Sequence, residues 1–141
     1  MTTAAVQYSP AELATALGLP APTDEQAAVI AAPTGPLVVV AGAGAGKTET
    51  MAARVVWLVA NGYADPGQVL GLTFTRKAAG QLLRRVRSRL ARLAGHLGDA
   101  VACIADLIER LHHLWPAHVA FAEFDGEAFA QALVVAFLAA E

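Results

Sequence analysis

The sequence predicts an α/β domain in which parallel strands are flanked by helices. Residues 37–41 and 69–74 are short, continuously apolar segments, which is typical of strands that are buried on both faces of a sheet. A segment with helical periodicity follows each of them. The resulting order of strand, helix, strand and helix predicts a parallel pair that is joined by a right-handed crossover.

Two short helices are expected before the first strand. Ser9 and Pro10 are favourable residues for the cap and the first position of a helix, and Gly18 ends it. Thr23 is the expected cap of the second helix. Gln26 follows three residues later, which is the spacing of a capping box.

Two longer helices follow the strands. The first is predicted to begin near Lys47 and to end near Ala60, and the second to cover residues 75–94. The apolar stripe of the second helix consists of Leu82, Leu83, Val86, Leu90 and Leu93. Farther along the chain, the pattern predicts helices over residues 99–114 and from about Gly126 onward.

Composition limits the class of protein. The 141 residues suffice for one domain, and the single cysteine, Cys103, excludes an internal disulfide and a metal site built from cysteines. The first residues lack the basic start and long apolar run of a secretory signal. The apolar stretch at residues 128–140 is shorter than the about 20 residues that a membrane span needs. We therefore expect a cytoplasmic protein that has no membrane partner.

Basic residues are concentrated in one segment, although the net charge of the chain is only −2. Seven of the ten Lys and Arg residues lie within residues 76–92: Arg76, Lys77, Arg84, Arg85, Arg87, Arg89 and Arg92. We interpret the arginines from Arg84 to Arg92 as a solvated face of the helix. Contact with nucleic-acid phosphates is the alternative.

The loop after the first strand matches the phosphate-binding pattern G-x-x-x-x-G-K-[ST], with alanine in place of the first glycine. The residues expected to bind ATP in this loop are Ala41, Gly42, Ala43, Gly44, Ala45, Gly46, Lys47 and Thr48. Glycines allow the backbone N–H groups to point at phosphate oxygens, and the start of the following helix adds a favourable dipole.

Two side chains of this loop have separate predicted roles. Lys47 is the predicted catalytic residue, because its ammonium group would reach the β- and γ-phosphates; it is expected to be exposed. The hydroxyl group of Thr48 is the predicted ligand of Mg²⁺. ATP and Mg²⁺ are therefore the expected cofactors.

The end of the second predicted strand carries residues that suit single-stranded DNA. Phe74 ends the strand, and Thr75, Arg76 and Lys77 begin the next helix. The carboxyl ends of parallel strands meet at one edge of a sheet, so these residues should lie beside the nucleotide site. An aromatic ring stacks on bases, and cations hold phosphates. Phe74 taken alone is also consistent with a core position.

Three segments together resemble the UvrD/Rep-like superfamily 1 DNA helicases. Residues 23–26 resemble the Q motif, residues 41–48 resemble motif I, and residues 72–79 resemble motif Ia, in the order and at the spacing of that family. The resemblance covers residues 19–92, about half of the chain. It implies a P-loop NTPase fold of the RecA-like type, in the form of a partial motor domain, and the apolar pattern after Gly95 adds a helical carboxy-terminal part.

The same resemblance implies roles for individual residues and partners. Gln26 would contact the adenine of ATP, although a helix cap alone also explains this residue. Phe74, Thr75, Arg76 and Lys77 would line the path of single-stranded DNA. Paired helicase–nucleases share these motifs, so a partner helicase or nuclease subunit is a further expectation.

The sequence departs from the family after Arg92. A helicase of this family has an apolar strand that ends in Asp-Glu, which holds Mg²⁺ and activates water, and no such segment follows. Two motor domains also need on the order of 300 residues. We therefore expect residues 1–94 to be the amino-terminal part of a helicase ATP-binding domain that does not hydrolyse ATP alone. Residues 95–141 are expected to be a helical segment of open relation, explained by truncation or a reading-frame change near Gly95.

Two other functions are compatible with the phosphate loop. The first is a non-hydrolysing ATP-binding scaffold that docks on a partner chain, and the missing Asp-Glu pair favours it. The second is a small P-loop kinase or transferase, against which the match of residues 72–79 to motif Ia argues.

Overall fold

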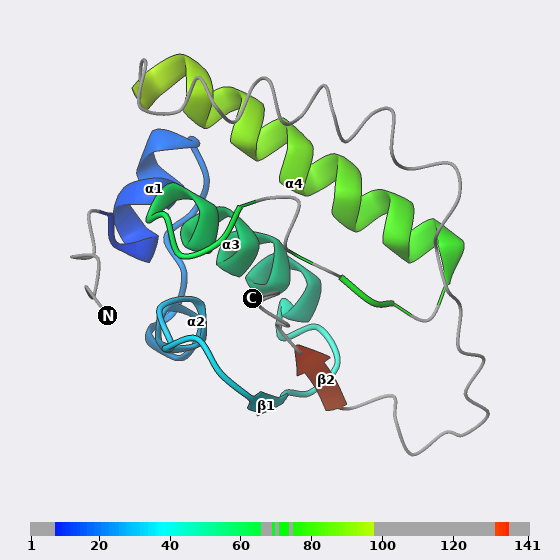
Figure 1. Ribbon diagram of the computed structural model, residues 1–141. Coiled ribbons are helices and arrows are strands. Elements are labelled where there is room, and N and C mark those ends of the chain that lie inside the picture. Colours follow the sequence, from blue (N-terminus) through cyan, green and yellow to red (C-terminus); the bar gives the residue numbers. More distant parts are fainter. Residues whose placement is uncertain (1–7, 66–68, 70, 74, 98–131, 136–141) are drawn as a thin grey trace.

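The computed structural model describes residues 8–65, 69, 71–73, 75–97 and 132–135 of the chain (Figure 1). These residues form four helices and two strands. In chain order they are α1 (Pro10–Ala16), α2 (Asp24–Ile30), β1 (Leu37–Val40), α3 (Lys47–Ala60), α4 (Arg76–Leu97) and β2 (Ala132–Val135). Helix α3 contacts α1, α2 and α4, so it is the central helix of the described part.

Helices α1 and α2 begin at the residues that the sequence predicted. The hydroxyl group of Ser9 accepts a hydrogen bond from the backbone N–H of Glu12 (3.2 Å), and the Glu12 carboxylate accepts one from the N–H of Ser9 (2.7 Å). The hydrogen bond from the Ser9 backbone N–H lowers the pKa of the Glu12 carboxyl group. Thr23 and Gln26 form the same reciprocal pair at the start of α2. Both capping boxes close backbone donors that a helix start otherwise leaves open.

The main core lies where α3 meets α1 and α4. Helix α3 contributes Val56, Trp57 and Leu58, which are all buried. Opposite them, the apolar stripe of α4 supplies Leu90 and Leu93, as its spacing predicted. Burial of side chains of this size stabilises the fold by roughly 1.5–3 kcal/mol each. The core therefore holds α4 firmly along α3.

The sheet differs from the predicted parallel pair. Strand β1 pairs with β2 in antiparallel register, so that Leu37 lies opposite Val135 and Val40 opposite Ala132. The described positions of the second predicted strand, 69 and 71–73, have no regular secondary structure. The helix predicted from about Gly126 is also wrong where it is described, because residues 132–135 form β2. Apolar, β-branched runs favour strands, but they specify neither the partner nor its direction.

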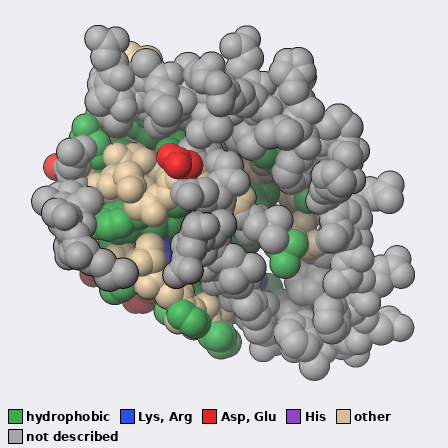
Figure 2. All heavy atoms as spheres, viewed as in Figure 1, with side chains coloured by type: hydrophobic (Ala, Val, Ile, Leu, Met, Phe, Trp, Pro, Cys, Tyr) green, Lys and Arg blue, Asp and Glu red, His purple; other side chains and the backbone are tan. Residues whose placement is uncertain are grey.

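Strand β1 is not buried on both faces, as its apolar run had predicted. The side chains of Val38 and Val40 are 67% and 75% exposed, whereas Leu37 and Val39 are partly buried. Successive side chains of a strand point to opposite faces, so Val38 and Val40 share an open face. Figure 2 shows that hydrophobic side chains reach the described surface in several places.

The predictions for the carboxy-terminal part of the chain have different outcomes. Helix α4 ends at Leu97, three residues beyond the predicted end at Ala94. The helix predicted over residues 99–114 lies outside the described residues, and the division at residue 94 stays a prediction. Within the described part of the chain, no helix is both long and apolar enough to cross a membrane.

Candidate nucleotide-binding site

The loop between β1 and α3 has the backbone conformation that its glycines permit. Gly44 and Gly46 have φ angles of 80° and 79°, in the left-handed region that side chains disfavour. The N–H of Ala45 donates to the carbonyl of Gly42 (3.3 Å), which closes a turn within the loop. Gly46 caps α3 without a side-chain hydrogen bond. The first turn of α3 therefore presents backbone donors that no capping side chain occupies.

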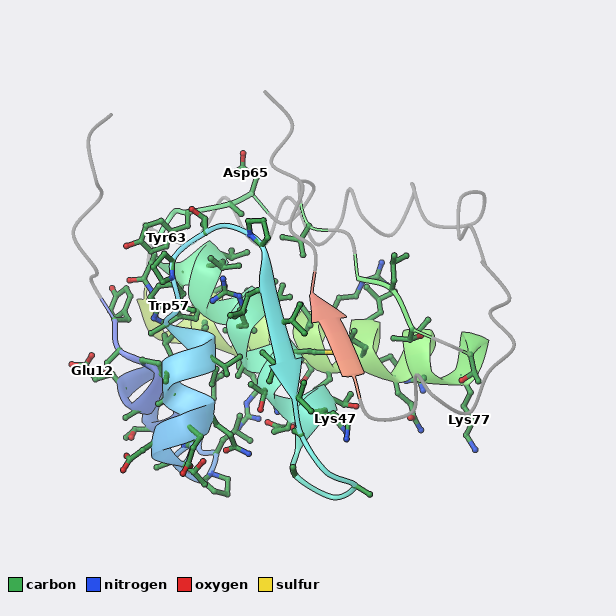
Figure 3. All side chains as sticks on the ribbon, turned by 90° about the horizontal axis from the view of Figure 1, so that it is seen from below. Glu12, Lys47, Trp57, Tyr63, Asp65 and Lys77 are labelled. Carbon is green, nitrogen blue, oxygen red and sulfur yellow. The ribbon has the colours of Figure 1, made fainter. Side chains whose placement is uncertain are left out.

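Lys47 folds back onto the loop that precedes it. Its ammonium group donates hydrogen bonds to the carbonyl oxygens of Ala41 (3.0 Å) and Gly42 (2.8 Å). The side chain is half-buried, so the expectation of an exposed lysine is wrong. An ammonium group has three donors and no acceptor, and these two carbonyls are acceptors within its reach. Figure 3 shows Lys47 at the start of α3, where the loop from β1 enters the helix.

Gln26 joins the start of α2 to the phosphate loop. Its side-chain oxygen accepts from the N–H of Thr23 (3.1 Å), and its side-chain nitrogen donates to the carbonyl of Ala45 (3.1 Å). The predicted capping box is thus confirmed, and the contact with the loop is additional. A Cβ atom on Gly46 would lie only 2.8 Å from the Gln26 nitrogen. The left-handed φ angle therefore favours glycine at position 46, and a larger residue there would also displace the Gln26 side chain.

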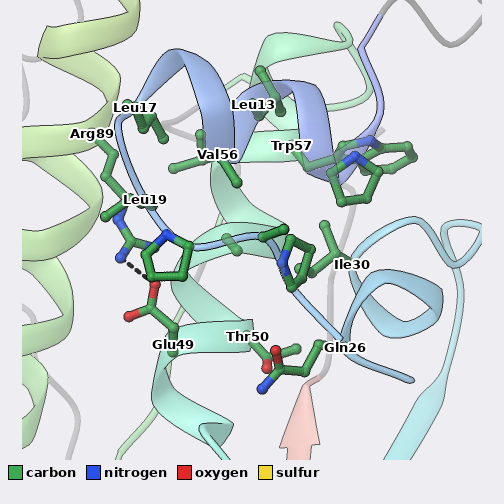
Figure 4. Close-up of a pocket in the computed structure, with 16 residues that line it drawn as sticks. Leu13, Leu17, Leu19, Gln26, Ile30, Glu49, Thr50, Val56, Trp57 and Arg89 are labelled. Carbon is green, nitrogen blue, oxygen red and sulfur yellow. Dashed lines mark hydrogen bonds and ion pairs between the residues drawn. The ribbon is translucent and has the colours of Figure 1, made fainter. Parts of the chain in front are cut away.

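Gln26 lines two cavities. One, of about 410 Å³, lies beside the phosphate loop and is lined by residues from α2, β1 and α3, including Val39, Lys47 and Thr50. The other, of about 380 Å³, lies between α1, α2, α3 and α4 (Figure 4). In Figure 4, Gln26 and Thr50 lie at one end of this second cavity and Leu13 lies toward the other. Gln26 is thus placed to contact a ligand in either cavity.

Arg54 was not singled out by the sequence, yet it fixes the position of α2. Its side chain is buried, with 1% of its surface exposed. The guanidinium group donates to the carbonyls of Val29 (2.9 Å), Ile30 (3.0 Å), Ala32 (2.9 Å) and Pro33 (3.1 Å). Burial lowers the pKa of Arg54, but arginine stays protonated in proteins. The sequence signal that could have revealed the buried role of Arg54 is that it is a lone arginine within an apolar helical segment.

The arginines of α4 are not uniformly solvated. Arg84, Arg85 and Arg92 are exposed, in agreement with the prediction of a solvated face. Arg89 is only 6% exposed, so the prediction is wrong for this residue. Its guanidinium group forms an ion pair with Glu49 in the first turn of α3. Its spacing from Leu82, seven residues earlier, placed it on the buried stripe and could have revealed this.

The four predicted DNA-binding residues are only partly described. Phe74 lies outside the described residues, and Arg76 is the first residue of α4. Thr75 and Lys77 are exposed. The hydroxyl group of Thr75 accepts a hydrogen bond from the N–H of Ala78 (3.1 Å), so Thr75 caps α4. Lys77 projects from the beginning of that helix (Figure 3).

The predicted Mg²⁺ ligand occupies a suitable position, although its role stays a prediction. Thr48 is the second residue of α3 and is exposed beside the loop. Across the residues that the structure describes, no group of three or more His, Cys, Asp and Glu side chains could hold a metal ion.

A strand, a glycine loop with left-handed residues, and a helix that begins with lysine define a phosphate-binding loop protein. Comparison with known families identifies the family to which the chain belongs within this class. The model of the UvrD/REP helicase N-terminal domain matches residues 22–122, well over half of the chain. The chain therefore belongs to the UvrD/REP helicase N-terminal domain family, as the three sequence motifs predicted.

Individual relatives agree with this assignment. The chain is 44% identical over 84 residues to the ATP-dependent DNA helicase UvrD2 of Mycobacterium bovis, which covers 60% of this chain and 12% of that protein. It is 38% identical over 96 residues to DNA helicase II of Haemophilus influenzae, with coverages of 64% and 13%. For DNA helicase IV of Escherichia coli, the identity is 54% over 54 residues, with coverages of 38% and 8%. The chain thus matches only a small part of each relative's length.

Proposed function

We propose that this chain is an ATP-binding part of an ATP-dependent DNA helicase motor, which translocates along single-stranded DNA. The observation that carries the proposal is the loop geometry, in which left-handed Gly46 is packed against Gln26 and followed by Lys47. The relatives named as DNA helicases support the same function. The RecA-like arrangement of parallel strands would belong to the whole motor domain.

Lys47 would exchange its acceptors when ATP binds. Its ammonium group now bonds to two neutral carbonyl oxygens, those of Ala41 and Gly42. The β- and γ-phosphate oxygens carry negative charge, which attracts the ammonium group more strongly than neutral carbonyl oxygens do, so they compete well for it. The backbone donors of the loop and of the first turn of α3 would hold the phosphates. Mg²⁺, which would neutralise phosphate charge, would be bound by the hydroxyl group of Thr48.

Gln26 is suited to read the adenine base. A glutamine side chain offers one acceptor and two donors, and the edge of adenine presents an amino group beside a ring nitrogen acceptor. In the structure these groups contact Thr23 and Ala45. Rotation of the side chain would redirect them without moving α2. Through its contact with Ala45, Gln26 would therefore couple the presence of the base to the phosphate loop.

Single-stranded DNA would bind at the beginning of α4. Thr75 and Lys77 are exposed there, and Arg76 adds a second cation to the same turn. The helix start supplies backbone donors that favour phosphates. Phe74, the residue before this turn, would supply the ring on which a base stacks. In the whole protein, a partner helicase or nuclease subunit would extend this path.

The chain alone is proposed to bind ATP without rapid hydrolysis, because no Asp-Glu pair follows an apolar run after Arg92. The same observation favours the second candidate, a non-hydrolysing ATP-binding scaffold that docks on a partner. The two candidates differ in one property that can be measured. A helicase part binds single-stranded DNA at the start of α4, whereas a scaffold does not.

The phosphate-loop assignment is tested by a pair of glycine variants at the two ends of α3. Gly46→Ala introduces a Cβ atom at a left-handed residue and against Gln26. We expect it to weaken binding of a fluorescent ATP analogue, in the presence of Mg²⁺, by at least about ten-fold. Gly62, with a φ of 70° and open space around it, is the matched control. Equal binding by Gly46→Ala and Gly62→Ala would rule out the assignment.

A further inference from the structure

Glu49 places a negative charge at the edge of the phosphate loop. It lies in the first turn of α3, directly after Thr48. Its Cβ atom lies 3.9 Å from the position that a Cβ atom on Gly46 would take. Charges at partly exposed positions interact over a Debye length of about 8 Å at physiological salt. A polyanion bound at the loop would therefore be repelled by an unpaired Glu49 carboxylate.

Two arginines of α4 neutralise this carboxylate. Arg89 pairs with one oxygen of Glu49, and Arg85 lies 3.4 Å from the other (Figure 4 shows the pair with Arg89). The Arg89 side chain is 8% exposed, whereas those of Arg85 and Glu49 are 42% and 46% exposed. Because Arg89 is buried, its pair with Glu49 is screened less by salt than the pair with Arg85. Arg89 is thus the principal partner of the carboxylate.

We propose that Arg89 is a positioning residue for nucleotide binding, which holds and neutralises Glu49 so that the loop accepts a polyphosphate. The proposal rests on the proposed function, since it assumes that the loop binds ATP. Arg89 acts without touching the nucleotide. Helix α4 would therefore contribute to ATP affinity through its buried face, because Arg89 on that face controls the charge of the Glu49 carboxylate on α3.

If Arg89 acts by neutralising Glu49, the loss of affinity in an Arg89 variant should depend on the charge of the ligand, which a purely structural role does not predict. Repulsion by an unpaired Glu49 scales with ligand charge, so ATP should suffer more than ADP, and adenosine should be unaffected. A distorted fold would instead weaken all three ligands alike. Removal of both charges should also restore binding, because no carboxylate would then remain to be neutralised.

The experiment is a competition titration against a fluorescent ATP analogue with ATP, ADP and adenosine. For Arg89→Gln we expect ATP affinity to fall about three- to ten-fold, ADP affinity to fall less, and adenosine affinity to stay the same. The double variant Glu49→Gln/Arg89→Gln should return ATP affinity to within two-fold of the wild-type value. Arg84→Gln removes an exposed arginine of the same helix and is the control, with no change expected.

Other results would overturn the inference. Equal losses for ATP and adenosine in Arg89→Gln would show a structural role, and so would a double variant that stays weak. If Arg89→Gln does not fold, Glu49→Gln alone decides, because it keeps a hydrogen-bond acceptor for Arg89. It should bind ATP at least as tightly as the wild type, and weaker binding would contradict the proposal. A folded wild-type chain that binds no ATP would defeat the proposed function itself.

Discussion

At the residue scale, the site depends on side chains that each make contacts with two elements. Gln26 caps α2 and also holds the loop at Ala45. Arg54 extends from α3 to four carbonyls at the end of α2 and just beyond it. Gln26 therefore joins α2 to the loop between β1 and α3, and Arg54 joins the end of α2 to α3.

Arg54 should be among the residues that matter most for stability. Arg54→Met keeps much of the side-chain volume but leaves buried carbonyls without their donors. We expect a loss of at least about 3 kcal/mol in the free energy of unfolding, measured by urea denaturation followed by circular dichroism. Arg84→Met, at an exposed position, should change it by less than about 0.5 kcal/mol. Similar stability of the two variants would contradict the role given to Arg54.

At the element scale, the four described helices could be predicted from the sequence, whereas the sheet could not, and a helix was wrongly predicted where β2 lies. Capping residues and apolar spacing are local signals, and they located α1, α2 and α3 to within a residue or two. The pairing of β1 with β2 joins residues that are far apart in sequence, and no local signal specifies it. The ion pair of Arg89 could not be predicted for a related reason, since its partner Glu49 lies on another helix.

The beginning of α4 should bind DNA through two separable contributions. Phe74→Ala should weaken binding by about 1–3 kcal/mol with little change in salt dependence, because stacking involves no counterions. Lys77→Ala should make the slope of log affinity against log salt shallower by about 0.7. The measurement is fluorescence anisotropy with labelled oligo-dT at several salt concentrations. A folded, ATP-binding chain without affinity for oligo-dT at low salt would favour the scaffold.

At the scale of the whole molecule, the described part is a helical core with a phosphate loop at one edge. The chain matches 12% and 13% of the lengths of two relatives, so helicase activity of the whole protein stays a proposal. The glycine loop and the start of α3 could be predicted from sequence because their residues are contiguous, whereas phosphate binding by the loop stays a prediction. The catalytic Asp-Glu pair of a motor domain is distant from this loop in sequence, and no apolar run that ends in such a pair follows Arg92.

The lack of this Asp-Glu pair predicts that the chain binds ATP without hydrolysing it. The purified chain should bind Mg-ATP yet release phosphate at a rate close to background, because its sequence contains no apolar run followed by the Asp-Glu pair that would activate water. A coupled phosphate-release assay, with and without oligo-dT, measures the rate. Steady hydrolysis that Lys47→Ala abolishes would mean that the chain contains a catalytic carboxylate that its sequence pattern did not reveal.

The central claim, that residues 41–48 bind the phosphates of ATP, is tested most directly by titrating Mg-ATP into the wild-type chain and Lys47→Ala in a calorimeter. Lys47→Ala should reduce the affinity by at least about ten-fold, or 1.4 kcal/mol, because a charged donor to the phosphates is lost. Arg84→Ala removes the same charge from an exposed position of α4 and should bind like the wild type. Unchanged affinity in a folded Lys47→Ala variant would contradict the account.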